Sequence, residues 1–289
     1  MNVSVTHIPD SAPHGGLYAV LSALHIPYEE ISHAPVRTVA EAQAIKTRIA
    51  GTGCKNLLLT DARQEVFVLV LLEEHKRADL KAIARALDTP RLLADTLQRA
   101  GITDVGILQQ AIKGNRLLDD GAGLLGMAYG EAMVDRFARD ALEQPGVKRI
   151  FLKVGVNDIV HPNCESLKDE ARAVTADEMI AGYQSLIAQA HARGIEVYLF
   201  TRTAWKGYTR NVLGSDDIQW SQEIDQMRQE INAWIRSADN PADGYIDLDF
   251  LCADEAATEL KSEYTTDGAH FTRAGQQAVV GAIPLTYFQ

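Results

Sequence analysis

Short apolar strands alternate with amphipathic helices along the second half of the chain, and this alternation constrains the fold more than any other feature. We predict strands over 105–108, 150–154, 196–200 and 245–248, and helices over 127–142, 176–193, 217–236 and 273–283. Strands and helices in regular alternation form a parallel sheet that is covered by helices on both faces. The expected fold class of this region is therefore α/β, with a parallel sheet between two helical layers.

Two sets of polar residues stand where such a sheet presents its ligand crevice, beyond the carboxyl ends of the strands. Asn157 closely follows the strand at 150–154, and its side-chain amide can donate to a developing oxyanion. Asp267 stands three residues before His270, just ahead of a helix that opens near Thr272. At this spacing a carboxylate can orient an imidazole so that the second ring nitrogen acts as a base. We expect a hydrolase-type acid/base pair here, with a helix cap or a turn as the alternative interpretation of each motif.

The first hundred residues follow another pattern. Helical spacing over 15–25 is followed by two apolar segments at 56–60 and 66–72, which a polar turn separates. Such a pair predicts a hairpin or a meander. Helices are then expected over 77–87 and 94–99.

The overall composition narrows the class of protein. A net charge of −11 and a pI of about 5.2 argue against general affinity for phosphate backbones, although a local tRNA contact stays open. No apolar run approaches the ~18 to 20 residues that cross a bilayer. The three cysteines are widely spaced and no secretory signal is visible, which predicts free thiols and a cytoplasmic location. His161 and Cys164 are too few ligands for a metal site, and we expect neither a metal nor a cofactor.

Four segments carry a resemblance to the SGNH/GDSL hydrolases over about 105–285. They are GNRLLDDGAG (114–123), VDRFARDALEQPGVKRIFLKVGVNDI (134–159), TADEMIAGYQSLIAQAHARG (175–194) and DGAHFTRAGQQAVV (267–280). The resemblance implies a flavodoxin-like three-layer parallel sheet and the activity of an esterase, lipase or deacetylase. It also implies that Asn157 is the oxyanion asparagine and that Asp267 and His270 are the acid and the base.

The chain departs from that family at its nucleophile. The Gly-Asp-Ser block, which the family carries on its first strand, has no counterpart, because no serine follows a strand in that context; the ten serines stand at 4, 11, 22, 32, 166, 185, 215, 221, 237 and 262. Ala111 stands where the oxyanion glycine is expected, and its backbone N–H can still donate. Weak or absent esterase activity is therefore expected, since loss of a triad serine removes most of the rate acceleration.

The N-terminal part, over about 15–100, resembles the prolyl-tRNA editing deacylases of the YbaK type. HAPVRTVAEA (33–42), GTGCKNLLL (51–59) and EEHKRADLKAIARAL (73–87) carry this resemblance. It implies that Lys55 holds aminoacyl-tRNA and activates water at the ester, with a solvated lysine at a strand edge as the alternative. The family's G-x-x-x-P loop is absent, so this module is truncated.

The two resemblances predict a YbaK-like segment over 1–103 and an SGNH-like domain over 104–289. We hypothesise that 66–72 supplies the missing first strand of the parallel sheet, which would put Glu73, Glu74 and His75 in the place of the nucleophile. Three functions follow: a weak or impaired carboxylic ester hydrolase, an aminoacyl-tRNA deacylase that uses Lys55, or a chimeric binder of acyl ligands without turnover. The expected partners are a small acyl ester or an aminoacyl-tRNA, and no membrane.

Overall fold

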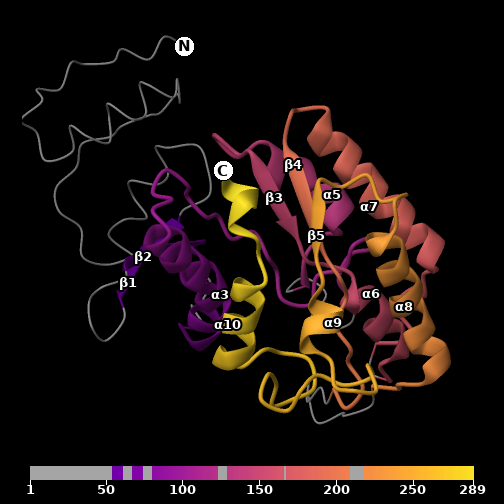
Figure 1. Ribbon diagram of the computed structural model, residues 1–289. Coiled ribbons are helices and arrows are strands. Elements are labelled where there is room, and N and C mark those ends of the chain that lie inside the picture. The colour runs from indigo at the N-terminus through magenta and orange to yellow at the C-terminus, as the bar shows by residue number, and fades with distance from the viewer. Residues whose placement is uncertain (1–53, 61–66, 74–79, 123–128, 166, 209–217) are drawn as a thin grey trace, which may run out of the picture. The chain divides into compact units, whose positions relative to one another are not determined.

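The computed structural model describes residues 54–60, 67–73, 80–122, 129–165, 167–208 and 218–289, with the backbone alone up to residue 88. The chain divides into two compact units, Met1–Leu80 and Lys81–Gln289. Each unit is described by itself, and Figure 1 colours both by residue number.

The described part of the first unit is a two-stranded antiparallel sheet. β1 (Cys54–Thr60) pairs with β2 (Phe67–Glu73) along the full length of both strands, so that Cys54 lies opposite Glu73. The predicted hairpin is confirmed. The hypothesis that 66–72 supplies the first strand of the parallel sheet is wrong, because this strand belongs to a sheet whose other member is β1. Pairing across a short loop costs less loop-closure entropy than pairing with a distant strand.

The second unit contains a parallel sheet with the strand order β3-β4-β5. β3 (Arg149–Leu152) and β5 (Gly244–Ile246) flank β4 (Glu196–Phe200). The strands expected at 150–154, 196–200 and 245–248 are therefore found, the last one cut short because a helix begins at Leu248. The strand expected at 105–108 is wrong. That segment has no regular structure, and its apolar side chains pack singly on the core while Leu108 is 62% exposed.

The helices of this unit agree broadly with the pattern in the sequence. They are α3 (Leu80–Arg99), α5 (Met133–Phe137), α6 (Val156–Val160), α7 (Ala176–His191), α8 (Gln222–Arg236), α9 (Leu248–Cys252) and α10 (Arg273–Gly281). The two helices expected at 77–87 and 94–99 form the single helix α3, which runs through Pro90. None of the helices in the described ranges has the length and apolar character of a membrane span. Cys164 and Cys252 are buried, and neither forms a disulfide bond with another described residue.

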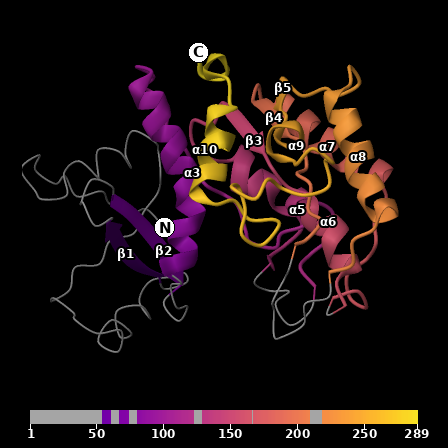
Figure 2. The same ribbon diagram turned by 60° about the horizontal axis from the view of Figure 1, so that its bottom comes forward.

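Strand β4 shows why both faces of the sheet are covered. Val197 and Leu199 point into one core with residues of α7 and α8, whereas Tyr198 and Phe200 point into a second core with residues of α3 and α10. All four side chains are at most 6% exposed. Figures 1 and 2 show these two pairs of helices on opposite sides of the sheet. The expected three-layer α/β arrangement is confirmed for this unit.

Candidate active site

Asp267 and His270 form a hydrogen-bonded pair. The Asp267 Oδ2 atom lies 2.7 Å from His270 Nδ1, and Oδ1 accepts hydrogen bonds from the backbone N–H groups of His270 (2.8 Å) and Ala269 (3.0 Å). Partial burial opposes ionisation of Asp267, but these hydrogen bonds outweigh it and lower the pKa of the carboxyl group. Asp267 is therefore an anion at neutral pH, held in place to orient the imidazole.

The loop that carries the pair is held by its own side chains. Thr265 Oγ1 donates to the His270 carbonyl oxygen (2.9 Å) and accepts from the Gly268 N–H (3.0 Å). Thr272 then caps α10 by accepting a hydrogen bond from the Gly275 N–H at 3.2 Å. The spacing of the motif follows from this geometry, since the turn closes on Thr265 and the N-cap of α10, Thr272, stands two residues after His270.

Gly268 brings this loop against the segment that follows β4. Its φ is +84°, and a Cβ atom there would lie 2.5 Å from the Tyr208 backbone nitrogen and 2.6 Å from Gly207. Only glycine combines this conformation with so close an approach of two backbones. The His270 ring lies edge-on to the Tyr208 ring, with 5.8 Å between the ring centroids.

The second ring nitrogen of His270 is open to a reactant. The side chain is 61% exposed, and within the described ranges Nε2 has no hydrogen-bond partner. None of the described serine hydroxyl groups contacts it, in agreement with the missing Gly-Asp-Ser block. The arrangement can accept a proton from water or from another solvent-borne group.

Asn157 lies in the first turn of α6, directly after the carboxyl end of β3. Gly155 allows the sharp turn between them, because its φ is +112° and a Cβ atom would lie 2.1 Å from the Tyr183 hydroxyl oxygen. The half-buried Asn157 side chain donates from Nδ2 to the Asn115 carbonyl oxygen at 3.0 Å. An amide nitrogen has two hydrogens, so the second can still be donated to an oxyanion.

Two residues that the sequence did not single out fix this region. Asp158 is fully buried and accepts hydrogen bonds from the backbone N–H groups of Leu117 (2.7 Å) and Leu118 (3.1 Å). The Asn115 amide nitrogen donates to the carbonyl oxygens of Tyr129 and Glu131. The sequence signal that could have indicated Asp158 is its place directly after Asn157, in the segment that follows a strand. A carboxylate there can accept hydrogen bonds from the unpaired backbone N–H groups of an adjacent loop.

Arg136 holds the other side of this region. Its guanidinium donates to Asn115 Oδ1 from Nε (3.2 Å) and Nη2 (2.9 Å), and to the Gln110 carbonyl oxygen from Nη1 (3.0 Å). Arg136 is 1% exposed. It is a positioning residue for the segment before Gly114 and had no role in the sequence-based prediction.

Three other predicted site residues, Ala111, Lys55 and Glu73, lie in the described ranges. Ala111 is exposed in an irregular segment, and no hydrogen bond joins it to Asn157. Lys55 lies in β1 opposite Leu72, in the first unit, and Glu73 ends β2. Glu74 and His75 lie outside the described residues.

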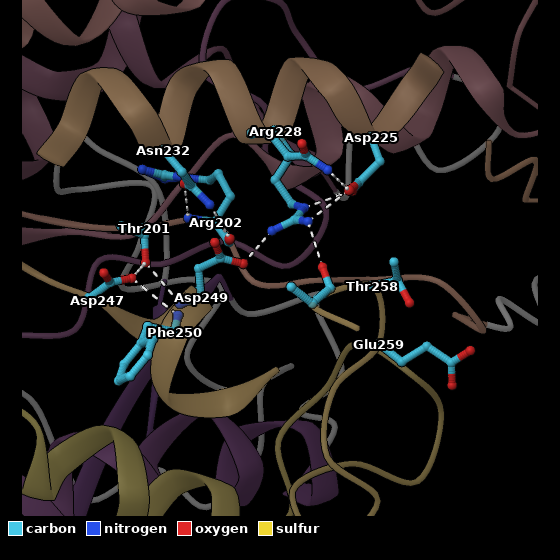
Figure 3. A network of polar contacts seen from close by, with 12 residues as sticks. Thr201, Arg202, Asp225, Arg228, Asn232, Asp247, Asp249, Phe250, Thr258 and Glu259 are labelled. Atoms are coloured by element: carbon cyan, nitrogen blue, oxygen red, sulfur yellow. Dashed lines mark hydrogen bonds and ion pairs between the residues drawn. The ribbon is translucent and has the colours of Figure 1, made fainter. Parts of the chain in front are cut away.

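A buried polar network ties the carboxyl ends of β4 and β5 to α8 (Figure 3). Arg228 is paired with both carboxylate oxygens of Asp225 (2.6 and 2.7 Å) and with Asp249. Thr201 donates to Asp247 at 3.0 Å. These carboxylates are engaged by arginines, hydroxyl groups and backbone N–H groups, so they hold the sheet edge and are poor candidates for an acid or a base. No group of three potential metal ligands occurs within the ranges that the structure describes.

Two family models match the chain. The model of the GDSL-like lipase/acylhydrolase family matches residues 83–278, more than half of the chain. The model of the aminoacyl-tRNA editing domain matches residues 33–105. Both matches include the greater part of α3. A comparison with curated proteins gives no match.

Several solved structures are similar to this chain. A putative acylhydrolase from Bacteroides fragilis has 16% sequence identity and a TM-score of 0.47, over 69% of this chain and 80% of that chain. An acetyl xylan esterase has 24% identity and a TM-score of 0.47, over 67% and 87% of the two chains. A protein described as a putative platelet activating factor from Streptococcus pneumonia has 20% identity and a TM-score of 0.45, over 73% and 96%.

Proposed function

The chain belongs to the GDSL-like lipase/acylhydrolase family, and from this premise we propose that it hydrolyses carboxylic esters at the Asp267–His270 pair, with water as the attacking group. The observation that carries the proposal is the 2.7 Å hydrogen bond between Asp267 Oδ2 and His270 Nδ1 beside an exposed Nε2 atom. A carboxylate that orients a histidine in this way turns the far ring nitrogen into a general base.

The reaction balances without a serine. His270 Nε2 takes a proton from water as the hydroxide oxygen attacks the ester carbonyl carbon. The tetrahedral oxyanion accepts a hydrogen bond from the second amide N–H of Asn157. When the intermediate collapses, the C–O bond to the alcohol breaks and His270 returns the proton to the leaving alkoxide. The products are a carboxylic acid and an alcohol.

The expected rate is low. Triads that have lost their nucleophile keep roughly 10³ to 10⁴ of acceleration over water, from oxyanion stabilisation and binding. We therefore expect turnover of activated esters with small acyl groups. Because the expected rate is low, the assay needs a control variant that lacks a different histidine.

The test is hydrolysis of p-nitrophenyl acetate by the full chain and by His270→Ala. His191 provides a matched control, because its Nε2 atom lies 2.9 Å from Asp243 Oδ2 in another histidine–aspartate pair. We expect His270→Ala to lose the turnover and His191→Ala to keep it. Equal rates for wild type and His270→Ala would reject the hydrolase and leave a binder of acyl ligands.

A second function is supported by the match of residues 33–105 to the aminoacyl-tRNA editing domain. In this alternative, Lys55 in β1 holds the aminoacyl-tRNA and water attacks its ester. Release of a mischarged amino acid from tRNA, lost in Lys55→Ala and kept in His270→Ala, would identify this activity. The reverse dependence would assign the release to the second unit.

A further inference from the structure

Arg202 carries a buried positive charge at the carboxyl edge of the parallel sheet. It stands two residues after β4 and is 3% exposed. In the described ranges no carboxylate forms an ion pair with it, and its Nε and Nη2 atoms have no hydrogen-bond partner there. Desolvation lowers the pKa of the guanidinium, although the group stays protonated at neutral pH. A buried charge without a counter-charge destabilises a fold, so this arginine calls for another explanation than stability.

The remaining nitrogen of the Arg202 guanidinium has a defined target. Nη1 donates to the Val154 carbonyl oxygen, just beyond the carboxyl end of β3. The Tyr183 hydroxyl group of α7 donates to the same oxygen at 2.8 Å. The guanidinium carbon also lies over the Tyr183 ring, 4.9 Å from the ring centroid. A carbonyl oxygen has two lone pairs, so one backbone oxygen after β3 is held by two donors from two other elements.

The backbone of Arg202 is fixed as well. The Asn232 side chain of α8 accepts a hydrogen bond from the Arg202 N–H at 2.6 Å and donates to the Arg202 carbonyl oxygen at 2.8 Å (Figure 3). Asn232 is fully buried. The guanidinium therefore extends from a fixed attachment, and its bond to Val154 sets the distance between the segments that follow β3 and β4.

The Val154 carbonyl group helps to determine where Asn157 lies. It belongs to the peptide plane that precedes Gly155, and at Gly155, with a φ of +112°, the chain turns into α6. Asn157 stands in the first turn of this helix. Rotation of the peptide plane would move α6 and the Asn157 amide with it. A displacement of about 1 Å can reduce the rate of a positioned reaction by about 10².

We propose that Arg202 is a positioning residue for ester hydrolysis, because its bond to the Val154 carbonyl oxygen holds Asn157 where the amide meets the oxyanion. The inference rests on the function proposed above, in which Asn157 is the oxyanion donor. Arg202 touches no reacting atom, so its effect passes through the loop 154–157. The buried charge destabilises the fold but places this loop. Removal of the charge should therefore lower activity without lowering stability.

The test replaces Arg202 by Met in the full chain, since Met is also unbranched and has no charge. The kcat for p-nitrophenyl acetate should fall about ten- to a hundredfold. The KM should stay within about twofold, because the oxyanion donor acts in the transition state and not on the bound ester. The urea midpoint should stay the same or rise, because the unpaired buried charge is gone.

Arg228 provides the matched control for stability. It is 1% exposed, but it is paired with Asp225 and Asp249. Arg228→Met leaves these carboxylates without their cation and should lower the urea midpoint. If Arg202→Met does not fold, or lowers the midpoint as far as Arg228→Met, Arg202 is a structural residue and the proposal is overturned. An unchanged kcat in folded Arg202→Met would overturn it too.

A measurement without substrate separates this proposal from the hydrolase. The NMR signals of the Asn157 side-chain amide, assigned by their loss in Asn157→Asp, should shift in Arg202→Met. Those of Asn240, whose amide bonds the Ile235 carbonyl oxygen at 2.8 Å, should stay in place. If wild type has no turnover but the Asn157 signals alone shift, the hydrolase fails and the placement of Asn157 by Arg202 stands. If wild type turns over and Arg202→Met changes neither signals nor kcat, the positioning role fails and the hydrolase stands.

Discussion

The Asn157 side chain donates a hydrogen bond from Nδ2 to the backbone oxygen of Asn115, 3.0 Å away, and thereby joins the loop after β3 to the segment after Gly114. One amide hydrogen is used in this bond and the other stays available. The same bond thus orients the donor that the proposed oxyanion requires.

Replacing Asn157 by Ala should reduce turnover of p-nitrophenyl acetate by about 10² to 10³, the usual effect of deleting one oxyanion donor. Asn163 is a matched control, because its amide also bonds a local carbonyl oxygen, that of Ile159 at 2.7 Å. Asn163→Ala should leave the rate within a small factor of wild type. Equal losses in the two variants would indicate a structural effect and remove Asn157 from the reaction.

Replacing Asp267 by Asn should abolish most of the His270-dependent turnover while the chain stays folded. The amide oxygen can still accept one hydrogen bond, but the anion that stabilises the imidazolium is gone. Asp243→Asn changes the carboxylate of the other histidine–aspartate pair and should retain the activity. Rates that are unchanged in Asp267→Asn would show that the pair only caps the loop.

Replacing Gly268 by Ala should impair activity more than it lowers overall stability. The added methyl group would meet the backbone of Gly207 and Tyr208 at 2.5 to 2.6 Å and push the His270 loop away. Gly146 is the control, since its φ is +73° but no atom lies within 4 Å of a Cβ there. Gly146→Ala carries the conformational strain of about 1 to 2 kcal/mol without the collision. Similar activities in the two variants would contradict the assigned role of the contact.

Asp158 should make the second unit more stable as the pH falls. Burial raises its pKa to about 6, from 3.8 in the unfolded chain, against the opposing hydrogen bonds of Leu117 and Leu118 and the charge of Arg116. Between these two values the folded protein binds more protons than the unfolded chain, so the free energy of unfolding rises as pH decreases from about 7 to about 4. Asp158→Asn cannot titrate and loses this contribution.

Urea unfolding at pH 7, 6 and 5 would measure the effect. The free energy of unfolding of wild type minus that of Asp158→Asn should increase from pH 7 to pH 5. The other carboxyl groups titrate alike in both proteins and cancel in this difference. If the free energy of unfolding of wild type minus that of the variant decreases toward pH 5, the two N–H donors stabilise the carboxylate more than burial destabilises it.

Substitution of Leu97 would show whether α3 belongs to the core of the second unit. It lies in α3, is 1% exposed, and packs in the same core as Tyr198 and Phe200. Leu97→Ala should lower the free energy of unfolding by about 2 to 5 kcal/mol, whereas Gln98→Ala on the exposed face should change it little. A chain cut at the predicted boundary of 103/104 would leave this core uncovered. A stable fragment of 104–289 would show that α3 is dispensable and support that boundary.

The sequence predicted the parts of the fold in which local pattern and tertiary packing agree. The four residues of β4 from Val197 to Phe200 are apolar or aromatic and are buried on both faces, and the bounds of the strand were predicted without error. The segment 105–108 is also apolar, but it pairs with none of the described strands. The sequence of one segment does not indicate whether another segment will pair with it. The pattern predicted two helices, over 77–87 and 94–99, yet α3 is continuous through Pro90, and after the proline Leu93 and Leu97 pack in the second core.

The candidate site was predictable where chemistry and spacing coincide within one loop. Asp267 and His270 are three residues apart, so the sequence carries their contact directly. Asn115 and Asn157 are forty-two residues apart, and the bond between them runs to a backbone oxygen, which no side-chain pattern marks. The contribution of Arg136 to Asn115 and Gln110 was hidden for the same reason.

Among the described strands, β3 has a hydrogen-bonded neighbour on one side only, β4. A strand edge with unpaired N–H and C=O groups can accept a strand from a separate molecule. A short synthetic peptide is therefore a natural reagent for this protein, because it can be offered to the edge in trans and its side chains varied one at a time. A peptide ending in Gly-Asp-Ser, docked parallel to β3, would deliver a hydroxyl group to the carboxyl edge of the sheet. A gain of turnover that requires the serine of this peptide would show that a nucleophile can be supplied by complementation instead of mutation.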